Sequence, residues 1–119
     1  MLFIIQGQIE SLSSADKEIV LPIPVDCEIE EAYAVCDGAV ASGSSNKLVL
    51  QVISGSDLIF EKDSEADGFA DDDALQLVSQ EGSKRFEQLS EVKLKCTVGG
   101  TISVAEVRFV LKCKRARDY

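Results

Sequence analysis

The segment "EVKLKCTVGGTISVAEVRFVLKC", from Glu91 to Cys113, constrains the fold more than any other part of the chain. Apolar and polar residues alternate on both sides of Gly99 and Gly100, which is the pattern of half-buried strands. The two glycines permit the positive φ angles that a two-residue hairpin turn requires. The segment therefore predicts one long antiparallel hairpin that turns at the glycines.

This turn also fixes a register, in which an apolar row lies on one face and opposite charges pair on the other. The predicted cross-strand pairs are Val92–Val107, Leu94–Ala105, Cys96–Ser103, Lys93–Glu106 and Glu91–Arg108. A slip by one residue would turn the apolar row outward, so the pattern favours this register.

Alternating or apolar runs separated by turn-rich pieces continue along the rest of the chain. The predicted strands are Leu2–Ile9, Glu18–Ile23, Ile29–Cys36, Lys47–Ser54, Leu58–Glu61, Leu75–Ser79, Glu91–Val98 and Thr101–Cys113. About eight short strands at this spacing are typical of an antiparallel β-sandwich or jelly roll. We expect an all-β single domain over residues 1–113, followed by a basic tail over residues 114–119.

The segment "DCEIEEAYAVCDG", from Asp26 to Gly38, fits two structures. As a helix it would have Asp26 as its N-cap and Gly38 just past its end. As a strand it places Ile29, Tyr33 and Val35 on one face. The two prolines that precede it favour an extended approach, and we predict a strand.

The formal net charge of −9 makes the chain a poor partner for nucleic acid or anionic lipid, because like charges repel. The start, "MLFIIQGQIES", lacks the basic flank of a secretory signal and is predicted to be a first strand. No run approaches the ~20 apolar residues that span a bilayer. We therefore expect a chain made in the cytoplasm, with no nucleic-acid or membrane partner.

The four cysteines do not follow a zinc-binding spacing, and the chain contains no histidine. They are Cys27, Cys36, Cys96 and Cys113. Free cysteine is among the most buried residue types, so we predict small apolar core residues. A disulfide formed later, outside the cell, is the alternative.

The absence of histidine removes the Ser-His-Asp and Cys-His routes to an activated nucleophile. A P-loop frame begins at Gly38 but has Ser44 where the lysine should stand. An EF-hand-like run begins at Asp63 but ends on Ala74, where a bidentate carboxylate is required. We expect no enzyme, no cofactor and no metal centre, with an irregular weak Ca²⁺ site in the acidic loop as an alternative.

Two segments are candidates for partner contact. The first strand is apolar on both faces at Leu2, Phe3, Ile4 and Ile5, as expected of a segment covered by a partner or by ordinary core. The end of the chain is basic on an otherwise acidic body, either as an interaction arm or as a frayed tail. Its predicted contact residues are Lys112, Lys114, Arg115 and Arg117.

The order of elements supplies a resemblance. A proline-containing approach, an aromatic strand, a Gly/Ser/Asn turn and a late valine-rich pair of strands occur at Pro22–Val25, Tyr33–Ala39, Leu48–Gly55 and Val92–Leu111. This arrangement resembles the small β-sandwich proteins that decorate or cement the heads of tailed bacteriophages.

The resemblance implies a virion structural protein on the capsid exterior, a homo-oligomer, favoured as a trimer, that binds the major capsid protein. It also implies a rigid scaffold that stabilises the assembled head through broad contacts. The alternatives are a tail- or fibre-associated virion sandwich and a lectin-like ligand-binding jelly roll. The lectin alternative would require exposed aromatic residues, and the chain has no tryptophan.

Overall fold

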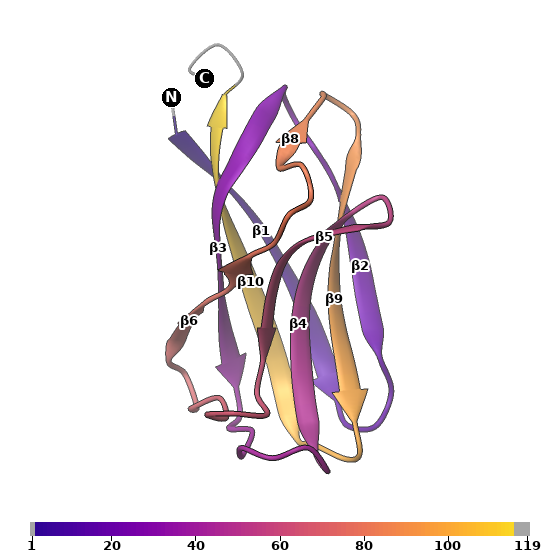
Figure 1. Ribbon diagram of the computed structural model, residues 1–119, viewed down its shortest axis with the longest axis vertical. Helices are drawn as coiled ribbons and strands as arrows, with labels where there is room; N and C mark the ends of the chain where they lie inside the picture. The colour runs from indigo at the N-terminus through magenta and orange to yellow at the C-terminus, as the bar shows by residue number, and fades with distance from the viewer. Residues whose placement is uncertain (1, 116–119) are drawn as a thin grey trace.

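The computed structural model describes residues 2–115, which form ten strands and no helix (Figure 1). The strands are β1 (Leu2–Leu12), β2 (Lys17–Pro22), β3 (Cys27–Asp37), β4 (Lys47–Ser54), β5 (Asp57–Asp63), β6 (Ala74–Gln76), β7 (Val78–Ser79), β8 (Arg85–Phe86), β9 (Glu91–Gly99) and β10 (Val104–Arg115). None of the described residues belongs to a helix long and apolar enough to cross a membrane. The predicted all-β fold is confirmed.

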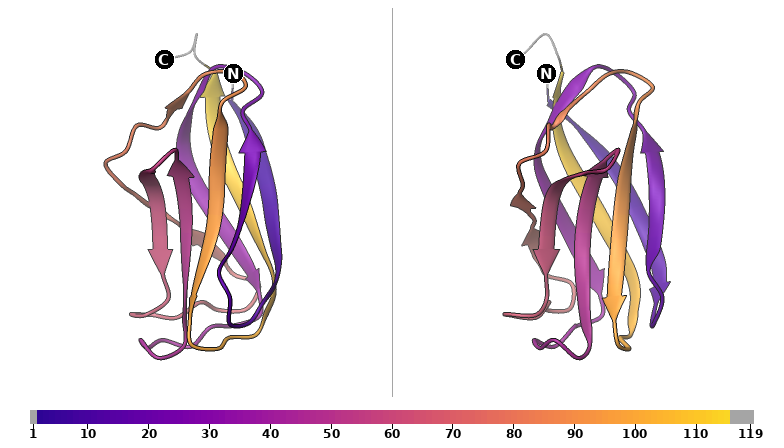
Figure 2. Two further views of the ribbon diagram at one scale, coloured as in Figure 1. Left: turned by 90° about the vertical axis from the view of Figure 1, so that its right-hand side faces the viewer. Right: turned by 45° about the vertical axis from the view of Figure 1, so that its right-hand side comes forward.

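The strands form two antiparallel sheets packed face to face (Figure 2). Sheet A has the order β1-β10-β3-β6, and β8 also pairs with β3. Sheet B has the order β2-β9-β4-β5-β7. The predicted β-sandwich is therefore correct, and its first strand lies beside its last.

The predicted hairpin around Gly99 and Gly100 is wrong. The strands β9 and β10 lie in different sheets, and residues 100–103 carry the chain across the sandwich from one to the other. The strand β9 pairs with β2 and β4, while β10 pairs with β1 and β3. None of the predicted register pairs forms: Val92–Val107, Leu94–Ala105, Cys96–Ser103, Lys93–Glu106 and Glu91–Arg108.

The charged residues of the predicted hairpin find other partners. The Lys93 ammonium lies 3.2 Å from the Glu18 carboxylate on β2, within sheet B. Arg108 lies 2.9 Å from Glu106 on its own strand. The predicted apolar row is correct at Val92, Leu94, Cys96 and Val107, which line the interior from opposite sheets. It is wrong at Ser103 and Ala105, which are exposed, while Val104 is buried in their place.

The crossing between the sheets depends on Gly100. Its φ angle is +73°, a left-handed conformation that L side chains rarely adopt. A Cβ placed on Gly100 would collide with the backbone carbonyl oxygen of Ser45. A glycine is required here because the chain both turns and passes close to the loop before β4.

The segment over β3 is a strand, as predicted, but its faces differ from the prediction. The pairing of β3 with β10 skips Glu30, and this β-bulge reverses the alternation of side chains. Ile29 and Ala32 consequently both face the core, whereas Tyr33 and Val35 are half-buried on the outer face of sheet A. The prediction that Ile29 shares a face with Tyr33 and Val35 is wrong.

The edge strands β1 and β2 belong to different sheets and lie along the same side of the sandwich (Figure 2). Gly7 brings them close. A Cβ on Gly7 would lie 2.8 Å from the Cδ1 atom of Leu94 and 2.9 Å from those of Ile19 and Leu21. The missing side chain lets the middle of β1 approach sheet B.

The strand predicted over Thr101–Cys113 is observed over Val104–Arg115. The strand β10 continues to Arg115, so Lys114 and Arg115 are part of sheet A. Arg117 lies outside the described residues.

Candidate functional site

The strand β1 is an open edge of sheet A. It pairs with β10 on one side and has no strand on its other side within the described residues. Its eleven residues contain no proline, lysine or arginine. Prolines and basic side chains commonly protect an edge strand from further pairing in natural proteins, and β1 has none of them.

The orientation of the Glu10 carbonyl shows which backbone groups face outward. The Nζ atom of Lys17, at the start of β2, donates a hydrogen bond of 2.9 Å to this carbonyl oxygen, so the oxygen is directed away from β10. Hydrogen-bonding groups alternate in direction along an antiparallel strand. The N–H and C=O groups of Leu2, Ile4, Gln6 and Gln8 therefore point away from β10 too. We refer to this outer side of residues 2–10 as the β1 edge.

The first half of the β1 edge is apolar. Leu2 and Ile4 are 55% and 58% exposed on the outer face, while Phe3 and Ile5 pack toward the core. The predicted contact segment is therefore divided between two roles. Only its outward residues are available to a partner, because Ile5 is ordinary core.

Cations flank this apolar half. Lys114 lies opposite Leu2 and Lys112 opposite Ile4 in the register of β1 with β10. Arg115 lines a shallow depression of about 180 Å³ together with Phe3, Pro24 and Val25. We refer to Lys112, Lys114 and Arg115 as the basic end.

Lys112 is held by a neighbour on β3. Its Nζ atom lies 3.5 Å from the Glu31 carboxylate, which also accepts a hydrogen bond from the hydroxyl of Tyr33. This contact fixes Lys112 on the outer face of sheet A, and its side chain is still 40% exposed. An exposed pair of this kind adds little stability, so its charge remains available to a partner.

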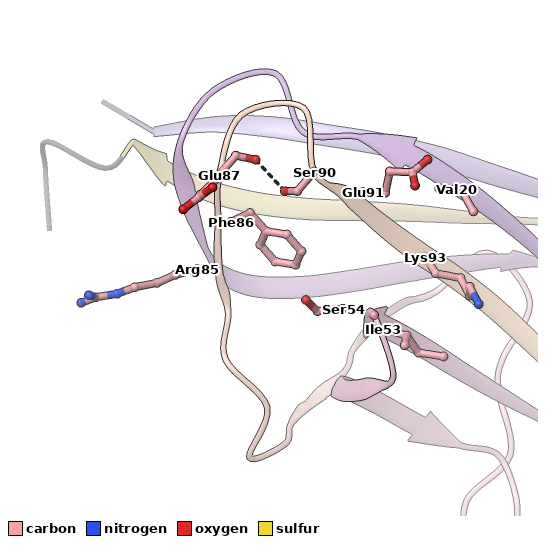
Figure 3. Close-up of a pocket in the computed structure, with 10 residues that line it drawn as sticks. Val20, Ile53, Ser54, Arg85, Phe86, Glu87, Ser90, Glu91 and Lys93 are labelled. Atoms are coloured by element: carbon pink, nitrogen blue, oxygen red, sulfur yellow. Dashed lines mark hydrogen bonds between the residues drawn. The ribbon is translucent and has the colours of Figure 1, made fainter.

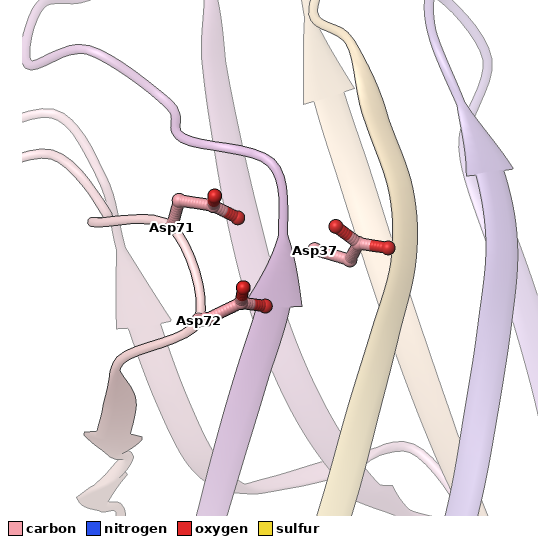
Figure 4. Close-up of side chains that lie close together, drawn as sticks. All are labelled: Asp37, Asp71 and Asp72. Atoms are coloured by element: carbon pink, nitrogen blue, oxygen red, sulfur yellow. The ribbon is translucent and has the colours of Figure 1, made fainter.

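Carboxylates gather at the opposite end of the same face. Glu10, Glu106 and Asp37 are register partners on the adjacent strands β1, β10 and β3. Oxygen atoms of Asp37, Asp71 and Asp72 lie within 4.8 Å of one another, all three residues being exposed (Figure 4). We refer to Glu10, Glu106, Asp37, Asp71 and Asp72 as the carboxylate row.

Backbone contacts hold the far end of the carboxylate row. The Gly38 N–H donates a hydrogen bond of 2.8 Å to Asp71 Oδ1, and the Asp72 N–H donates one of 2.9 Å to the Cys36 carbonyl. The row therefore joins the loop after β5 to the end of β3. Arg108 lies 2.9 Å from Glu106 and offsets its charge, so the other four carboxylates make this end of sheet A negative.

The EF-hand-like run after Asp63 is partly neutralised within the chain. Lys47 Nζ lies 3.1 Å from Glu65 and 3.5 Å from Asp63. The hydrogen bond to Glu65 and the charge of Asp63 raise the pKa of Lys47, which keeps it cationic. Two of the carboxylates that would hold Ca²⁺ in such a loop therefore already have a protein cation.

A larger cleft lies at another place, between the β4–β5 turn and residues 85–91 (Figure 3). Its volume is about 570 Å³, and Val20, Ile53 and Phe86 are its apolar lining. Two of its cations have partners outside the cleft: Arg85 pairs with Glu28, and Lys93 with Glu18. These two cations are thus held by neighbouring strands, whereas within the cleft the Ser90 hydroxyl donates a hydrogen bond to the Glu87 carbonyl (Figure 3).

The cysteines are free and buried, as predicted. Burial raises the pKa of Cys36 to about 11, and burial with the nearby Cys36 raises that of Cys96 to about 12. Burial and the nearby Cys27 raise the pKa of Cys113 to about 12. Thiols with such pKa values are protonated near neutral pH and make poor nucleophiles.

The comparisons with known proteins show a shared fold but identify no family for this chain. No family model matches the sequence, and no curated protein matches it. Among solved structures, the crystal structure of FLHE superposes with a TM-score of 0.52, covering 96% of this chain and 98% of that chain at 11% sequence identity. A likeness at this identity shows that the two chains share a fold.

The predicted relationship to phage head proteins is wrong. The near-full-length structural likeness is to FLHE, and no comparison supports a phage capsid protein. The decoration and cement function is therefore withdrawn with the resemblance that implied it. The capsid partner and the virion location depended on the same resemblance and lose that basis.

The structure brings together most of the residues predicted to contact a partner. Leu2 and Ile4 lie directly beside Lys114 and Lys112, although more than a hundred residues separate them in the sequence. The carboxylate row was not predicted. Its members come from four separate segments of the chain, and only their pairing across the sheet brings them into one row.

Proposed function

We propose that the chain is a non-catalytic binding protein whose β1 edge takes up an extended segment of polypeptide by strand addition. The observation that carries this proposal is that the β1 edge is open from Leu2 to Gln8, with outward backbone groups at Leu2, Ile4, Gln6 and Gln8. An added strand would pair with these groups, since main-chain hydrogen bonds supply affinity in this mode of recognition.

The side chains along the edge indicate the chemistry of the segment. Leu2 and Ile4 offer exposed apolar surface, and Lys112 and Lys114 stand beside them. All four lie on the outer face of sheet A, and side chains on one face of a strand recur at every second residue. A segment in which every second residue is by turns apolar and acidic would place its apolar side chains against Leu2 and Ile4 and its carboxylates near the lysines. Cross-strand pairs of both kinds stabilise neighbouring strands by ~0.2–1 kcal/mol each.

The absence of a catalytic role remains part of the proposal. The chain has no histidine, and the described cysteines are buried with raised pKa values. The large cleft has cations already paired outside it. These features favour recognition over chemistry.

The test uses a labelled synthetic peptide, called here the alternating peptide, in which every second residue is by turns isoleucine and glutamate and the residues between them are serine. Binding is measured by fluorescence anisotropy. Two further versions carry N-methyl groups on one or the other alternate set of amides. Methylation of the set that faces the β1 edge should abolish binding, and methylation of the other set should preserve it, because only one set donates to the new neighbour.

Two protein variants complete the experiment. Ile4→Lys places a charge on the exposed face of the β1 edge and should weaken binding about tenfold. Lys95→Glu changes the charge of a half-buried residue on β9 in sheet B and should leave it unchanged. Equal binding of all three peptides, or no effect of Ile4→Lys, would refute strand addition at β1.

A further inference from the structure

We infer that the strand added at the β1 edge is the β1 edge of a second copy of this chain, paired antiparallel across a two-fold axis. This inference rests on the proposed function, since it names the partner of the same edge. It follows from the distribution of charge along the edge.

The β1 edge is electrically polar along its length. The basic end flanks Leu2 and Ile4, whereas Glu10 begins the carboxylate row at the other end. Arg108 offsets the charge of Glu106 there, so the negative charge at the edge itself is that of Glu10. Six to eight residues separate these ends, which is about 20–27 Å along a strand. The distance exceeds the Debye length of ~8 Å at physiological salt, so the two ends act as separate charged sites on a partner.

Antiparallel self-pairing matches these opposite ends. When two copies pair with Gln6 at the axis, Leu2 of one copy lies opposite Glu10 of the second copy. The Leu2 N–H would then replace Lys17 Nζ as the donor to the Glu10 carbonyl. Lys114 is the neighbour of Leu2 on β10, so it lies two strand spacings from that Glu10, about 10 Å between Cα atoms. A lysine and a glutamate side chain can meet over Leu2 across this distance.

The two-fold axis forms the same contact twice. Glu10 of one copy receives Lys114 of the second copy, and the second Glu10 receives the first Lys114. A parallel arrangement would place basic end beside basic end and carboxylate beside carboxylate, and like charges destabilise paired strands. Antiparallel pairing also limits the assembly to two copies, because neither copy has a free β1 edge left for a third.

The same symmetry gives a charge-swap test, read out as molar mass by sedimentation equilibrium. Wild-type chain should dimerise, and raising the salt from 0.1 to 1 M, where the Debye length falls to about 3 Å, should weaken the dimer. Glu10→Lys and Lys114→Glu should each raise the dimer dissociation constant about tenfold or more, since each creates like-charge contacts at both symmetric positions. Lys95→Glu on sheet B is the matched control and should dimerise like wild type.

Mixing the two variants is the decisive step. A Glu10→Lys chain and a Lys114→Glu chain would restore opposite charges at both contacts, so the mixture should form a heterodimer that neither variant forms alone. The double variant E10K/K114E should again form a homodimer. A mixture that stays monomeric, or a Glu10→Lys variant that dimerises as well as wild type, would overturn the inference.

The peptide experiment separates this inference from the proposed function. If the wild-type chain remains monomeric at high micromolar concentration but binds the alternating peptide through its β1 edge, the second copy is not the partner and strand addition stands. If the chain neither dimerises nor binds the peptide, both proposals fall.

Discussion

The strands β1 and β2 are both sheet edges on the same side of the sandwich, yet they are protected to different extents: β2 carries its own protecting residues, whereas β1 is capped only at Glu10, by Lys17. The strand β2 has six residues, begins with Lys17 and ends with Pro22, and lysine and proline both discourage further pairing. The strand β1 has eleven residues and none of these features between Leu2 and Leu12. Two edges of one molecule thus differ in a way that the sandwich itself does not require.

The inner faces of the two edges are alike. Ile9 on β1 is buried, and Ile19 and Leu21 on β2 pack against the same core. Both strands are therefore held in place by ordinary apolar packing. The two strands differ in how their outer sides are protected from further pairing. The open edge at β1 is therefore a property of the surface and does not result from poor packing.

The largest expected effect separates the inner side of β1 from its outer side. Ile9→Ala should lower the free energy of unfolding by about 2–5 kcal/mol, because Ile9 is buried and its removal leaves a cavity. Ile4→Ala makes the same truncation on the outer side and should change it by no more than about 0.5 kcal/mol. Urea denaturation measures both values, and similar losses would contradict the division of β1 into two faces.

The second prediction concerns the crossing at Gly100, which keeps β9 and β10 in different sheets. Each of these strands then has its own edge neighbour, β2 beside β9 and β1 beside β10. Gly100→Ala should lower the free energy of unfolding by about 1–3 kcal/mol, because the left-handed conformation and the Ser45 carbonyl oppose a side chain. Gly55→Ala is the control, since Gly55 has a φ of +64° but nothing near its Cβ position. Thermal unfolding of the two variants should show the greater loss for Gly100, and the opposite order would contradict the geometry of the crossing.

The third prediction compares the thiols beside the two edges, Cys113 next to Phe3 on β1 and Cys96 next to Lys17 on β2. Each has a pKa raised from 9.0 to about 12. The folded chain keeps protons that the unfolded chain releases, so stability is complete below pH 9 and falls as the pH rises toward 12. Each thiol should contribute up to about 1.4 kcal/mol per pH unit to this loss.

Alanine variants provide the check. Cys96→Ala and Cys113→Ala should each be less stable near neutral pH, owing to a cavity, but should lose less stability between pH 9 and 10.5. Urea denaturation across this range measures the slope. A slope that neither variant reduces would contradict the assignment of raised pKa values to these two residues.

The smallest expected effect concerns Lys17 of β2, which caps a backbone carbonyl at the end of β1. Lys17→Met removes the ammonium that caps the Glu10 carbonyl and should change the free energy of unfolding by less than about 0.5 kcal/mol. It should strengthen binding of the alternating peptide about twofold, because one more carbonyl becomes free. Lys95→Met controls for the loss of charge, and equal anisotropy titrations of the two variants would show that the cap has no effect on pairing.

The positions of the strands were predictable because alternation of apolar residues reports local burial. The strand over Lys47–Ser54 agrees with the sequence prediction to the residue. The partner of each strand was not predictable in the same way. Gly99 and Gly100 allow the chain to turn, but the same freedom serves a hairpin or a crossing between sheets.

The faces of β3 and the pairing of β9 with β10 were both predicted wrongly, for local reasons that an apolar pattern does not show. The bulge at Glu30 reverses the faces of β3, and nothing in the spacing of Ile29 and Tyr33 signals an extra residue. The charge pairs that favoured the hairpin were equally well satisfied elsewhere, as Lys93 with Glu18 demonstrates.

Half of the candidate site was visible in the sequence. Apolar Leu2 and Ile4 and basic Lys112 and Lys114 were each unusual enough to be predicted as contacts. Their adjacency depends on pairing between the first and last strands, which no local pattern specifies. The assignment to phage head proteins failed for a related reason, since a pattern of strands and turns specifies a sandwich and not its family, and the observed fold is shared with FLHE.

The pairing of β1 with β10 has a consequence for biosynthesis. Leu2 cannot reach its neighbour Lys114 until the ribosome has made everything between them, which at about 5–20 residues per second takes roughly 5–25 seconds. Throughout that interval the nascent "LFII" segment has no sheet to join. A chaperone that recognises short apolar stretches would therefore meet this strand early, and would release it only when the last strand emerges.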